Sequence, residues 1–292
     1  MYLASGFMVC LLAFANPGCT SDGTTEVEET SPPATGGGGG CDEISAPERS
    51  SPQVEAGRLT GFHRSGQTFL TWTENGGVSG ESYRVYRSST QISGGQLEGA
   101  TVIATVPESS GYFYNEAGNG YQTRFVLTDY GEELPEGVGL HVHTTRETGP
   151  FAAWYAVTEV RNGVEQPLQN SLTIEASITE SRAFPCPVAV YTNGLKTLYT
   201  HWMDYSIWNP RFEGYAYNFW VGVPSGGNSS PLPLQLHLHA YGESWMRNWT
   251  VGDAYGSGTP FNLPAVWLEP DDNRNTWWYG FANDKSRGEQ PD

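Results

Sequence analysis

The chain has 292 residues, of which 38 % are hydrophobic, 13 % aromatic and only 16 % charged, against about 25 % charged in ordinary globular proteins. Its 32 acidic residues outnumber its 15 basic ones, and the resulting net charge of −17 excludes nucleic acid as an expected partner because such a surface repels polyanions. No apolar run approaches the ~20 residues of a membrane span. Low charge together with many aromatic residues favours an exported, β-rich protein.

The N-terminus holds a short apolar run, residues 6–15, which Asn16-Pro17-Gly18-Cys19 follows at once. An apolar run of about 7–15 residues that ends in small residues is typical of a signal peptide. The Gly18-Cys19 pair resembles the cleavage box of bacterial lipoproteins, although Asn16 stands where an aliphatic residue is usual. The resemblance implies that residues 1–19 are a signal and anchor. It also implies that Cys19 is lipidated and that the protein reaches the cell envelope or outer surface, with membrane contact only through that lipid. An ordinary cleaved signal peptide is the alternative.

Residues 20–51 are predicted to form a disordered tether rich in glycine, proline and acidic residues. Residues 20–40 hold five consecutive glycines and no aromatic side chain. Such a segment cannot bury enough apolar surface to offset its chain entropy, so we expect a flexible tether.

Two cysteines, Cys41 and Cys186, lie outside the signal and its lipidation candidate. Because cysteine pairs of exported proteins are usually oxidised, we expect a Cys41–Cys186 disulfide, with two unrelated free thiols as the alternative. The sequence contains no Cys-x-x-Cys spacing, which excludes a zinc ribbon.

The next segment, residues 52–182, alternates apolar and polar residues in short stretches that turn signals separate. Such period-2 stretches predict β-strands. Seven strands are predicted, at residues 57–63, 67–73, 82–87, 100–106, 123–128, 151–160 and 171–179. Seven short strands without a convincing helix predict a small immunoglobulin-type β-sandwich.

Three of these stretches resemble a fibronectin type III domain. Phe69-Leu70-Thr71-Trp72 followed by Tyr83-Arg84-Val85-Tyr86-Arg87 resembles its strands B and C, and residues 154–163 resemble strand F with the turn after it. The resemblance implies a fibronectin type III-like β-sandwich that serves as a spacer or binding domain without chemistry of its own.

The last segment, residues 188–292, holds eight of the ten tryptophans, and strands are predicted at residues 215–224, 231–240 and 263–270. The strand order and the run Leu-His-Leu-His-Ala-Tyr-Gly at residues 236–242 resemble the opening of secreted α/β-hydrolase esterases of the polyhydroxyalkanoate depolymerase-like group. In such enzymes a loop after a strand contributes a backbone N–H group to the oxyanion hole. The resemblance implies an α/β segment whose oxyanion-hole candidates are His239, Ala240, Tyr241 and Gly242.

The nucleophile motif of that fold, Gly-x-Ser-x-Gly, does not occur in the sequence. We therefore expect an incomplete α/β-hydrolase-like segment whose nucleophile lies beyond residue 292, so that the 292-residue chain shows no ester hydrolysis by itself. The expected whole is a surface-anchored extracellular serine esterase that acts on an ester or polyester and needs no cofactor.

Three groups of residues could hold a metal, and for each the interpretation without a metal is favoured. They are the His141-x-His143 pair in a predicted extra loop at residues 130–150, the His237-x-His239 pair, and Glu269 with Asp271 and Asp272. The first pair is expected to be solvated and the second to be structural, because neither has the further ligands that zinc needs. The acidic run is expected to form a turn at the end of a strand rather than a calcium site.

Trp277, Trp278 and Tyr279 are candidates for substrate binding, either as a stacking platform for a sugar ring or as part of a core or lid. A sugar platform would make the protein a non-catalytic surface binding protein with a carbohydrate-binding module, and this is the alternative function. An in-frame Gly-x-Ser-x-Gly downstream of codon 292 would favour the esterase, and a stop codon would favour the binding protein.

Overall fold

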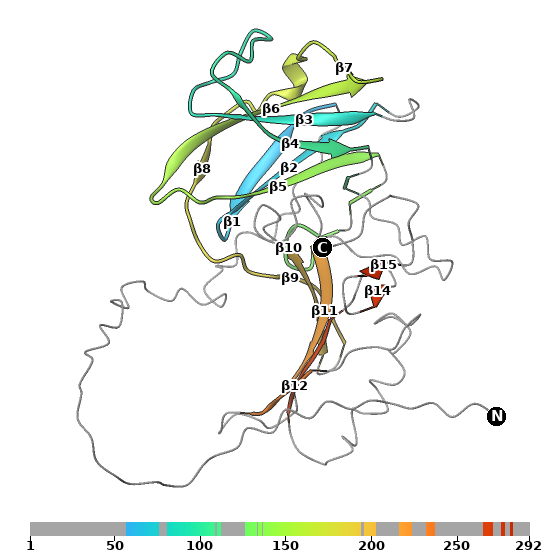
Figure 1. Ribbon diagram of the computed structural model, residues 1–292. Coiled ribbons are helices and arrows are strands. Elements are labelled where there is room, and N and C mark those ends of the chain that lie inside the picture. The colour runs from blue at the N-terminus through green and yellow to red at the C-terminus, as the bar shows by residue number, and fades with distance from the viewer. Residues whose placement is uncertain are drawn as a thin grey trace, which may run out of the picture. The chain divides into compact units, whose positions relative to one another are not determined.

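The structure is a computed structural model of the chain (Figure 1). It describes residues 57–75, 81–108, 110–111, 126–132, 134–135, 137–193, 196–202, 216–223, 232–236, 265–270, 276–277 and 281–282. The expected signal, lipidation site and tether, together with Cys41, lie outside the described residues.

Two antiparallel sheets pack against each other in the first part of the chain. One has the order β1-β2-β5 and consists of β1 (Thr60–Arg64), β2 (Gln67–Thr73) and β5 (Val138–Thr144). The other is five-stranded: β4 (Thr101–Pro107), β3 (Ser82–Ser88), β6 (Phe151–Arg161) and β7 (Val164–Glu165) follow in the order β4-β3-β6-β7, and a fifth strand pairs with β6. A short 3-10 turn, η3 (Asn170–Leu172), precedes β8 (Ile178–Glu180), which pairs with the beginning of β6.

Side chains alternate between the two faces of a strand, so each sheet has one apolar face toward the other sheet. These two faces pack together into one core. This core contains Leu70, Trp72, Tyr83, Val85, Tyr155 and Val157. A close approach in the core explains a glycine in β5: a Cβ at Gly139 would lie 2.1 Å from the indole ring of Trp72. The bulky Trp72 therefore requires a residue without a side chain on the neighbouring strand.

Two tight turns fix the register of their hairpins. Ser65 and Gly66 join β1 to β2 with φ angles of 46° and 74°, and Asn162 and Gly163 join β6 to β7 with φ angles of 50° and 78°. Two successive positive φ angles are typical of the type I′ turn, which matches the twist of a two-stranded hairpin and favours Asn-Gly and similar pairs.

The structure confirms most of the strands predicted in this segment and corrects four regions. The predicted strand at residues 57–63 begins only at Thr60. Residues 126–128 of the predicted strand at 123–128 are not a strand, and the prediction at residues 171–179 reduces to η3 and the short β8. The predicted extra loop at residues 130–150 contains a full strand, β5, in the middle of its length.

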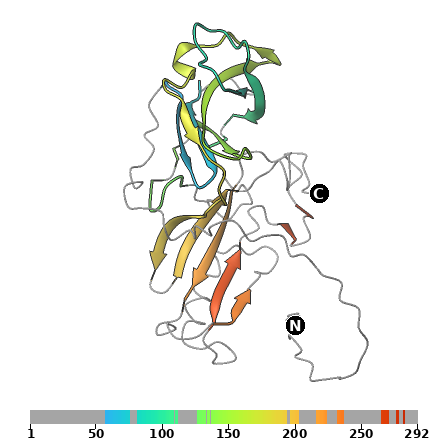
Figure 2. The same ribbon diagram turned by 90° about the vertical axis from the view of Figure 1, so that its left-hand side faces the viewer.

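A third, mixed sheet has the order β12-β13-β11-β10-β9 (Figure 2). Its strands are β9 (Val188–Asn193), β10 (Lys196–Trp202), β11 (Ala216–Gly222), β12 (Leu234–Leu236) and β13 (Val266–Pro270). All neighbours are antiparallel except β12 and β13, which run parallel. A separate two-stranded ribbon pairs β14 (Thr276–Trp277) with β15 (Phe281–Ala282).

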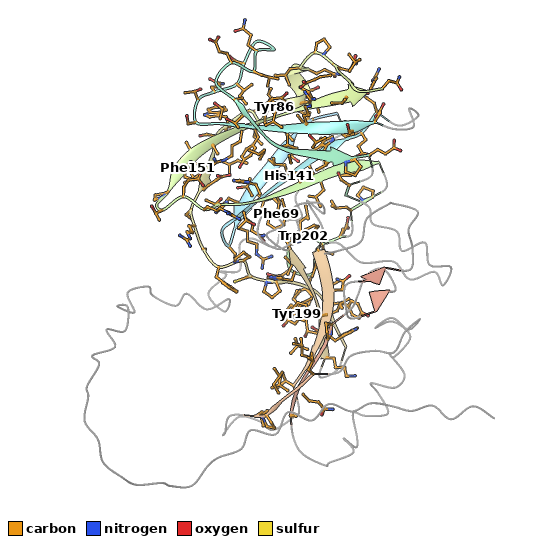
Figure 3. The ribbon with its side chains drawn as sticks, viewed as in Figure 1. Phe69, Tyr86, His141, Phe151, Tyr199 and Trp202 are labelled. Carbon is orange, nitrogen blue, oxygen red and sulfur yellow. The ribbon has the colours of Figure 1, made fainter. Side chains whose placement is uncertain are left out.

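The β1-β2-β5 sheet is buried on both of its faces. A second apolar cluster joins the face opposite the sandwich core to residues of β9, β10 and β11. Phe69 of β2 meets Trp202 of β10 edge to face, with ring centroids 5.9 Å apart, and Gln67 Nε2 donates a 3.0 Å hydrogen bond to the Trp202 carbonyl (Figure 3). Strand β2 is consequently buried at six of its seven positions.

The described part of the chain is β-rich and contains no α-helix, so the helices expected of an α/β segment are not seen there. For the same reason, within that part no helix is long and apolar enough to cross a membrane.

Candidate functional site

The predicted oxyanion-hole residues, His239 to Gly242, lie outside the described residues, as do Trp278 and Tyr279. Trp277 lies in β14, opposite Phe281. The oxyanion-hole candidates and the aromatic platform therefore stay predictions. The structure does describe β12, which precedes the predicted oxyanion-hole segment, and β13, which precedes the predicted acidic turn.

The parallel strands β12 and β13 pair Leu234 with Val266 and Leu236 with Leu268. Because the two strands are parallel, their carboxyl ends lie at the same edge of the sheet. The sequence places His239 three residues after the end of β12 and Asp271 directly after the end of β13. The predicted oxyanion-hole segment and the predicted acidic turn thus follow strands that end at one edge.

Cys186 is disulfide-bonded, and its partner lies outside the described residues. The free-thiol alternative is therefore wrong for Cys186. The pairing with Cys41 stays a prediction.

The His141–His143 pair is not solvated as predicted, because both histidines lie on β5 rather than in an exposed loop. His141 is only 5 % exposed and faces the interior between the two sheets of the sandwich (Figure 3). Burial, with a smaller contribution from the neighbouring His143, lowers the pKa of His141 to about 3, so the ring is neutral at physiological pH. His143 packs its ring against Tyr155, with centroids 6.5 Å apart. No group of three or more metal-ligating side chains occurs among the residues that the structure describes.

Sequence analysis missed a buried polar cluster around Glu180, the last residue of β8. The Glu180 carboxylate is fully buried and accepts three hydrogen bonds: from Thr68 Oγ1 at 2.5 Å, from the Tyr155 hydroxyl, and from Arg87 Nη2 at 2.8 Å. Arg87 also reaches the more exposed Glu147 at 2.8 Å, and its guanidinium lies 4.4 Å from the centroid of the Phe151 ring.

The cluster joins strands that are far apart in the sequence. In the β1-β2-β5 sheet, Thr68 lies directly opposite both His63 and His143. The His63 Nδ1 atom is 2.9 Å from Thr68 Oγ1, and its Nε2 atom is bonded to the backbone of Ser181, directly after β8. Burial and then the charge of Glu180 raise the pKa of Tyr155, so its hydroxyl stays protonated and donates.

An imidazole, a hydroxyl and a carboxylate occur together here, but their order does not suit acyl transfer. A serine- or threonine-based site needs the imidazole between the hydroxyl and the carboxylate, so that the imidazole accepts the hydroxyl proton. In this cluster Thr68 donates directly to Glu180, and Thr68 is fully buried. The arrangement fits a structural role, in which the hydrogen bonds of Glu180 hold β2, β3, β6 and β8 together.

A second buried polar group lies at the opposite end of β6. Glu81, directly before β3, and Glu159 of β6 each have side chains that are 2 % exposed, and both approach Arg161. Tyr83 donates a 2.9 Å hydrogen bond to Glu81 Oε2, and Asn75 Nδ2 donates a 3.0 Å bond to Glu159 Oε2. Paired carboxyl groups are also the residue type of general acid–base sites, but these two lie beneath the surface.

No protein-family profile and no curated protein matches the chain. Its distant structural neighbours are esterases. Ferric enterobactin esterase from Salmonella typhimurium is 14 % identical with a TM-score of 0.20, covering 74 % of this chain and 56 % of that one. A thermostable esterase is 14 % identical with a TM-score of 0.21, covering 80 % and 62 %. Enterochelin esterase from Shigella flexneri is 12 % identical with a TM-score of 0.18, covering 74 % and 55 %.

The chain thus spans between about half and three fifths of the length of these solved structures. TM-scores this low carry no argument for the fold or for the reaction, and the function has to be argued from the chain's own strands and residues.

Proposed function

We propose that the chain is the N-terminal portion of an extracellular ester hydrolase. In this proposal residues 52–182 form a fibronectin type III-like sandwich, residues 188–292 begin an α/β-hydrolase-like sheet, and a lipid on Cys19 anchors the protein to the cell envelope. The observation that carries the proposal is the parallel pairing of β12, which ends three residues before the run His239-Ala240-Tyr241-Gly242, with β13, which follows that run in the sequence.

Parallel pairing supports the α/β interpretation of residues 188–292 for a topological reason. Two parallel neighbours need a crossover of a dozen or more residues, which is usually helical, and residues 237–265 provide more than that length between β12 and β13. The pair also lies at one end of the sheet order, with β12 as the edge strand.

The strand order of the sandwich supports the fibronectin type III-like assignment. Strands β3, β6 and β7 are neighbours in one sheet, as strands C, F and G are in immunoglobulin-type sandwiches, and β1, β2 and β5 correspond to A, B and E of the facing sheet. Strand β4 extends the sheet that contains β3, which divides the seven strands into three and four.

The proposed reaction needs donors for the oxygen that becomes negatively charged in the tetrahedral intermediate. Backbone N–H groups of the segment from His239 to Gly242 would supply them, and one such donor is worth about 3–4 kcal/mol of transition-state stabilisation. The proposal places the nucleophile and its base in residues that follow Asp292, because the sequence contains no Gly-x-Ser-x-Gly. The substrate class is an ester or polyester outside the cell.

The test compares two substitutions at Gly242 in the protein translated from the complete reading frame. Gly242→Pro removes the backbone N–H, and Gly242→Ala keeps it. With short acyl p-nitrophenyl esters, kcat of G242P should fall by at least about 100-fold, while G242A should stay within a few-fold of the wild type. Equal kcat values for wild type and G242P would refute the oxyanion role. For the anchor, Cys19→Ser should move the protein out of the membrane fraction.

The alternative of a carbohydrate-binding protein has less support in the described residues. Trp72, Trp202 and Trp220 are buried in apolar cores and offer no ring face to a sugar. A stacking platform would therefore have to come from other aromatic residues, such as Trp277, Trp278 and Tyr279.

A further inference from the structure

The His63 ring of β1 lies between a buried hydroxyl and an exposed stretch of backbone. Its Nδ1 atom is 2.9 Å from Oγ1 of Thr68, its partner in the β1–β2 register. Its Nε2 atom has two partners on one residue, because it is 2.9 Å from the carbonyl oxygen of Ser181 and 3.1 Å from the backbone nitrogen of Ser181. A ring nitrogen carries either a proton or a lone pair, so Nε2 makes only one of these hydrogen bonds at a time.

Thr68 determines which nitrogen of the ring carries a proton. The single hydroxyl proton of Thr68 goes to Oε1 of Glu180, at 2.5 Å. Glu180 is ion-paired with Arg87 and acts there as a carboxylate, which accepts hydrogen bonds and donates none. Thr68 Oγ1 can therefore only accept from His63, and Nδ1 must be the donor. The proton on Nδ1 is fixed in this way in both the neutral and the charged ring.

The two protonation states of the ring then use different groups of Ser181. In the neutral ring Nε2 has the lone pair, so it accepts the Ser181 N–H. In the charged ring Nε2 has a proton, so it donates to the Ser181 carbonyl. The N–H belongs to the planar peptide unit that joins Glu180 to Ser181, and the carbonyl belongs to the unit that joins Ser181 to Arg182. A proton gained by the ring thus moves the hydrogen bond one peptide unit along the chain.

This change takes place where the sandwich is connected to the third sheet. Strand β8 ends at Glu180, and residues 181–187 lead directly to β9. The same connection passes close to the turn between β1 and β2, because a Cβ at Gly66 would lie 2.4 Å from the carbonyl oxygen of Ala183. His63 is partly exposed and Ser181 is exposed, so the ring can exchange protons with water.

We propose that His63 is a proton-operated switch at the beginning of the connection between β8 and β9. The neutral ring holds the end of β8 through the Ser181 N–H, and the charged ring holds the connection itself through the Ser181 carbonyl. Imidazole is the side chain whose charge ordinarily changes between about pH 5 and 8, so the switch operates under mild conditions. The inference is independent of the proposed hydrolase function.

The other charged and titratable groups of this region come from the elements packed against β1. They are His143 on β5, Tyr155 on β6, Glu180 on β8, Arg87 on β3 with its second partner Glu147, and Arg182 directly after Ser181. Arg87 and Tyr155 both donate to Glu180, and the Thr68 hydroxyl connects that carboxylate to the ring. Among the described residues, the hydrogen bonds of Nε2 go to Ser181. A proton gained by Nε2 is therefore directed at the Ser181 carbonyl.

The test is NMR of the isotope-labelled 292-residue chain as a function of pH. Long-range proton–nitrogen spectra should show a neutral His63 with its proton on Nδ1, and Nε2 as the atom that gains a proton in acid. The amide proton and carbonyl carbon shifts of Ser181 should change with the same midpoint. Hydrogen exchange of the Ser181 N–H, corrected for the intrinsic rate, should become about 2- to 10-fold faster once the ring is charged, because the N–H then loses its acceptor.

Two variants separate this switch from a general effect of pH. His63→Gln removes the titrating ring, so the shifts of Ser181 should no longer follow that transition. The matched control is His201→Gln on β10, which removes a partly exposed histidine from another sheet and should leave the transition of Ser181 unchanged. A neutral His63 with its proton on Nε2, Ser181 signals that do not follow the ring, or a Ser181 transition that persists in H63Q would overturn the proposal. If H63Q does not fold, the wild type and H201Q still decide through the position of the ring proton and the response of Ser181.

Discussion

At the scale of single residues, the described part of the chain contains two groups of hydrogen-bonded charged side chains that lie inside the sandwich rather than on its surface. Glu180, Thr68 and Tyr155 form a hydrogen-bonded group at one end of the core, and Glu159, Asn75 and Arg161 form another at the other end. The polar atoms of such groups are costly to bury unless they are paired. Each group therefore requires the strands that supply it to assemble in one register.

Arg87 has two acidic partners, Glu180 and Glu147, and we expect their substitutions to lower the free energy of unfolding by different amounts. Glu180→Gln removes the charge of the fully buried partner of Arg87 and should lower the free energy of unfolding by about 3 kcal/mol. Glu147→Gln removes the more exposed partner and should cost less than about 1 kcal/mol. Urea unfolding at neutral pH measures both variants. Equal losses would contradict the assignment of Glu180 as the centre of the cluster.

From the buried, neutral ring of His141 we expect the folded state to lose stability as the pH falls. Its folded-state pKa of about 3 lies below the ordinary value of 6.5, so between these pH values the unfolded chain binds a proton that the folded chain does not, and stability falls as the pH falls. Both of its ring nitrogens are buried without a hydrogen-bond partner. His141→Leu should therefore be at least as stable as the wild type at pH 7, and its advantage should grow by up to about tenfold in the unfolding constant per pH unit below 6.5. A constant difference between the two proteins from pH 7 to pH 4 would show that His141 is not buried as a neutral ring.

At the scale of elements, the sequence predicted the strands whose alternation is regular and missed those whose inward residues are polar. Strands β2, β3 and β6 alternate apolar and polar residues, and their predicted ranges agree with the structure to within one residue at either end. Strand β5 was predicted as a loop because His141 and His143 occupy its inward positions in the sandwich, where an apolar residue is expected. The Glu180 cluster was not predictable, because its partners come from positions 68, 87 and 155 and meet only when the sheets pair.

The close contact between β2 and β5 gives a prediction at this scale. Gly139→Ala brings a methyl group into the Trp72 indole and should destabilise the protein by about 1–3 kcal/mol, as overpacking of a core does. Trp72→Leu alone should also destabilise, because it leaves a cavity. The double variant should be more stable than the sum of the two losses implies, and strict additivity would show that the two positions do not touch.

At the scale of the whole molecule, the β1-β2-β5 sheet is shared between two apolar clusters. Phe69 and Leu70 are adjacent in β2 but belong to different clusters, the first with Trp202 of β10 and the second with the sandwich core. The sequence suggested two separate domains at residues 52–182 and 188–292. Strand β2 is predicted from the alternation of apolar and polar residues. Because each of its two faces packs against an apolar cluster, it is buried at six of its seven positions.

The disulfide of Cys186 gives a prediction at the same scale. If its partner is Cys41, the bond closes a loop of about 145 residues, and removing it should cost a few kcal/mol on a chain-entropy estimate. Mass spectrometry of a non-reduced digest should yield a peptide pair that joins the two cysteines. A peptide that joins Cys186 to Cys19 or Cys10 would contradict this pairing and, in the case of Cys19, the proposed lipid anchor as well.

The proposed function assigns to the chain the oxyanion segment of an ester hydrolase but not its nucleophile. Labelling with a fluorophosphonate probe, which reacts with activated serine nucleophiles, tests this claim most directly when the 292-residue chain is compared with the product of the complete reading frame. The account predicts labelling of the longer protein only, on a serine that follows Asp292. Strong labelling of the 292-residue chain, or no labelling of the longer protein under conditions in which it is folded, would contradict it.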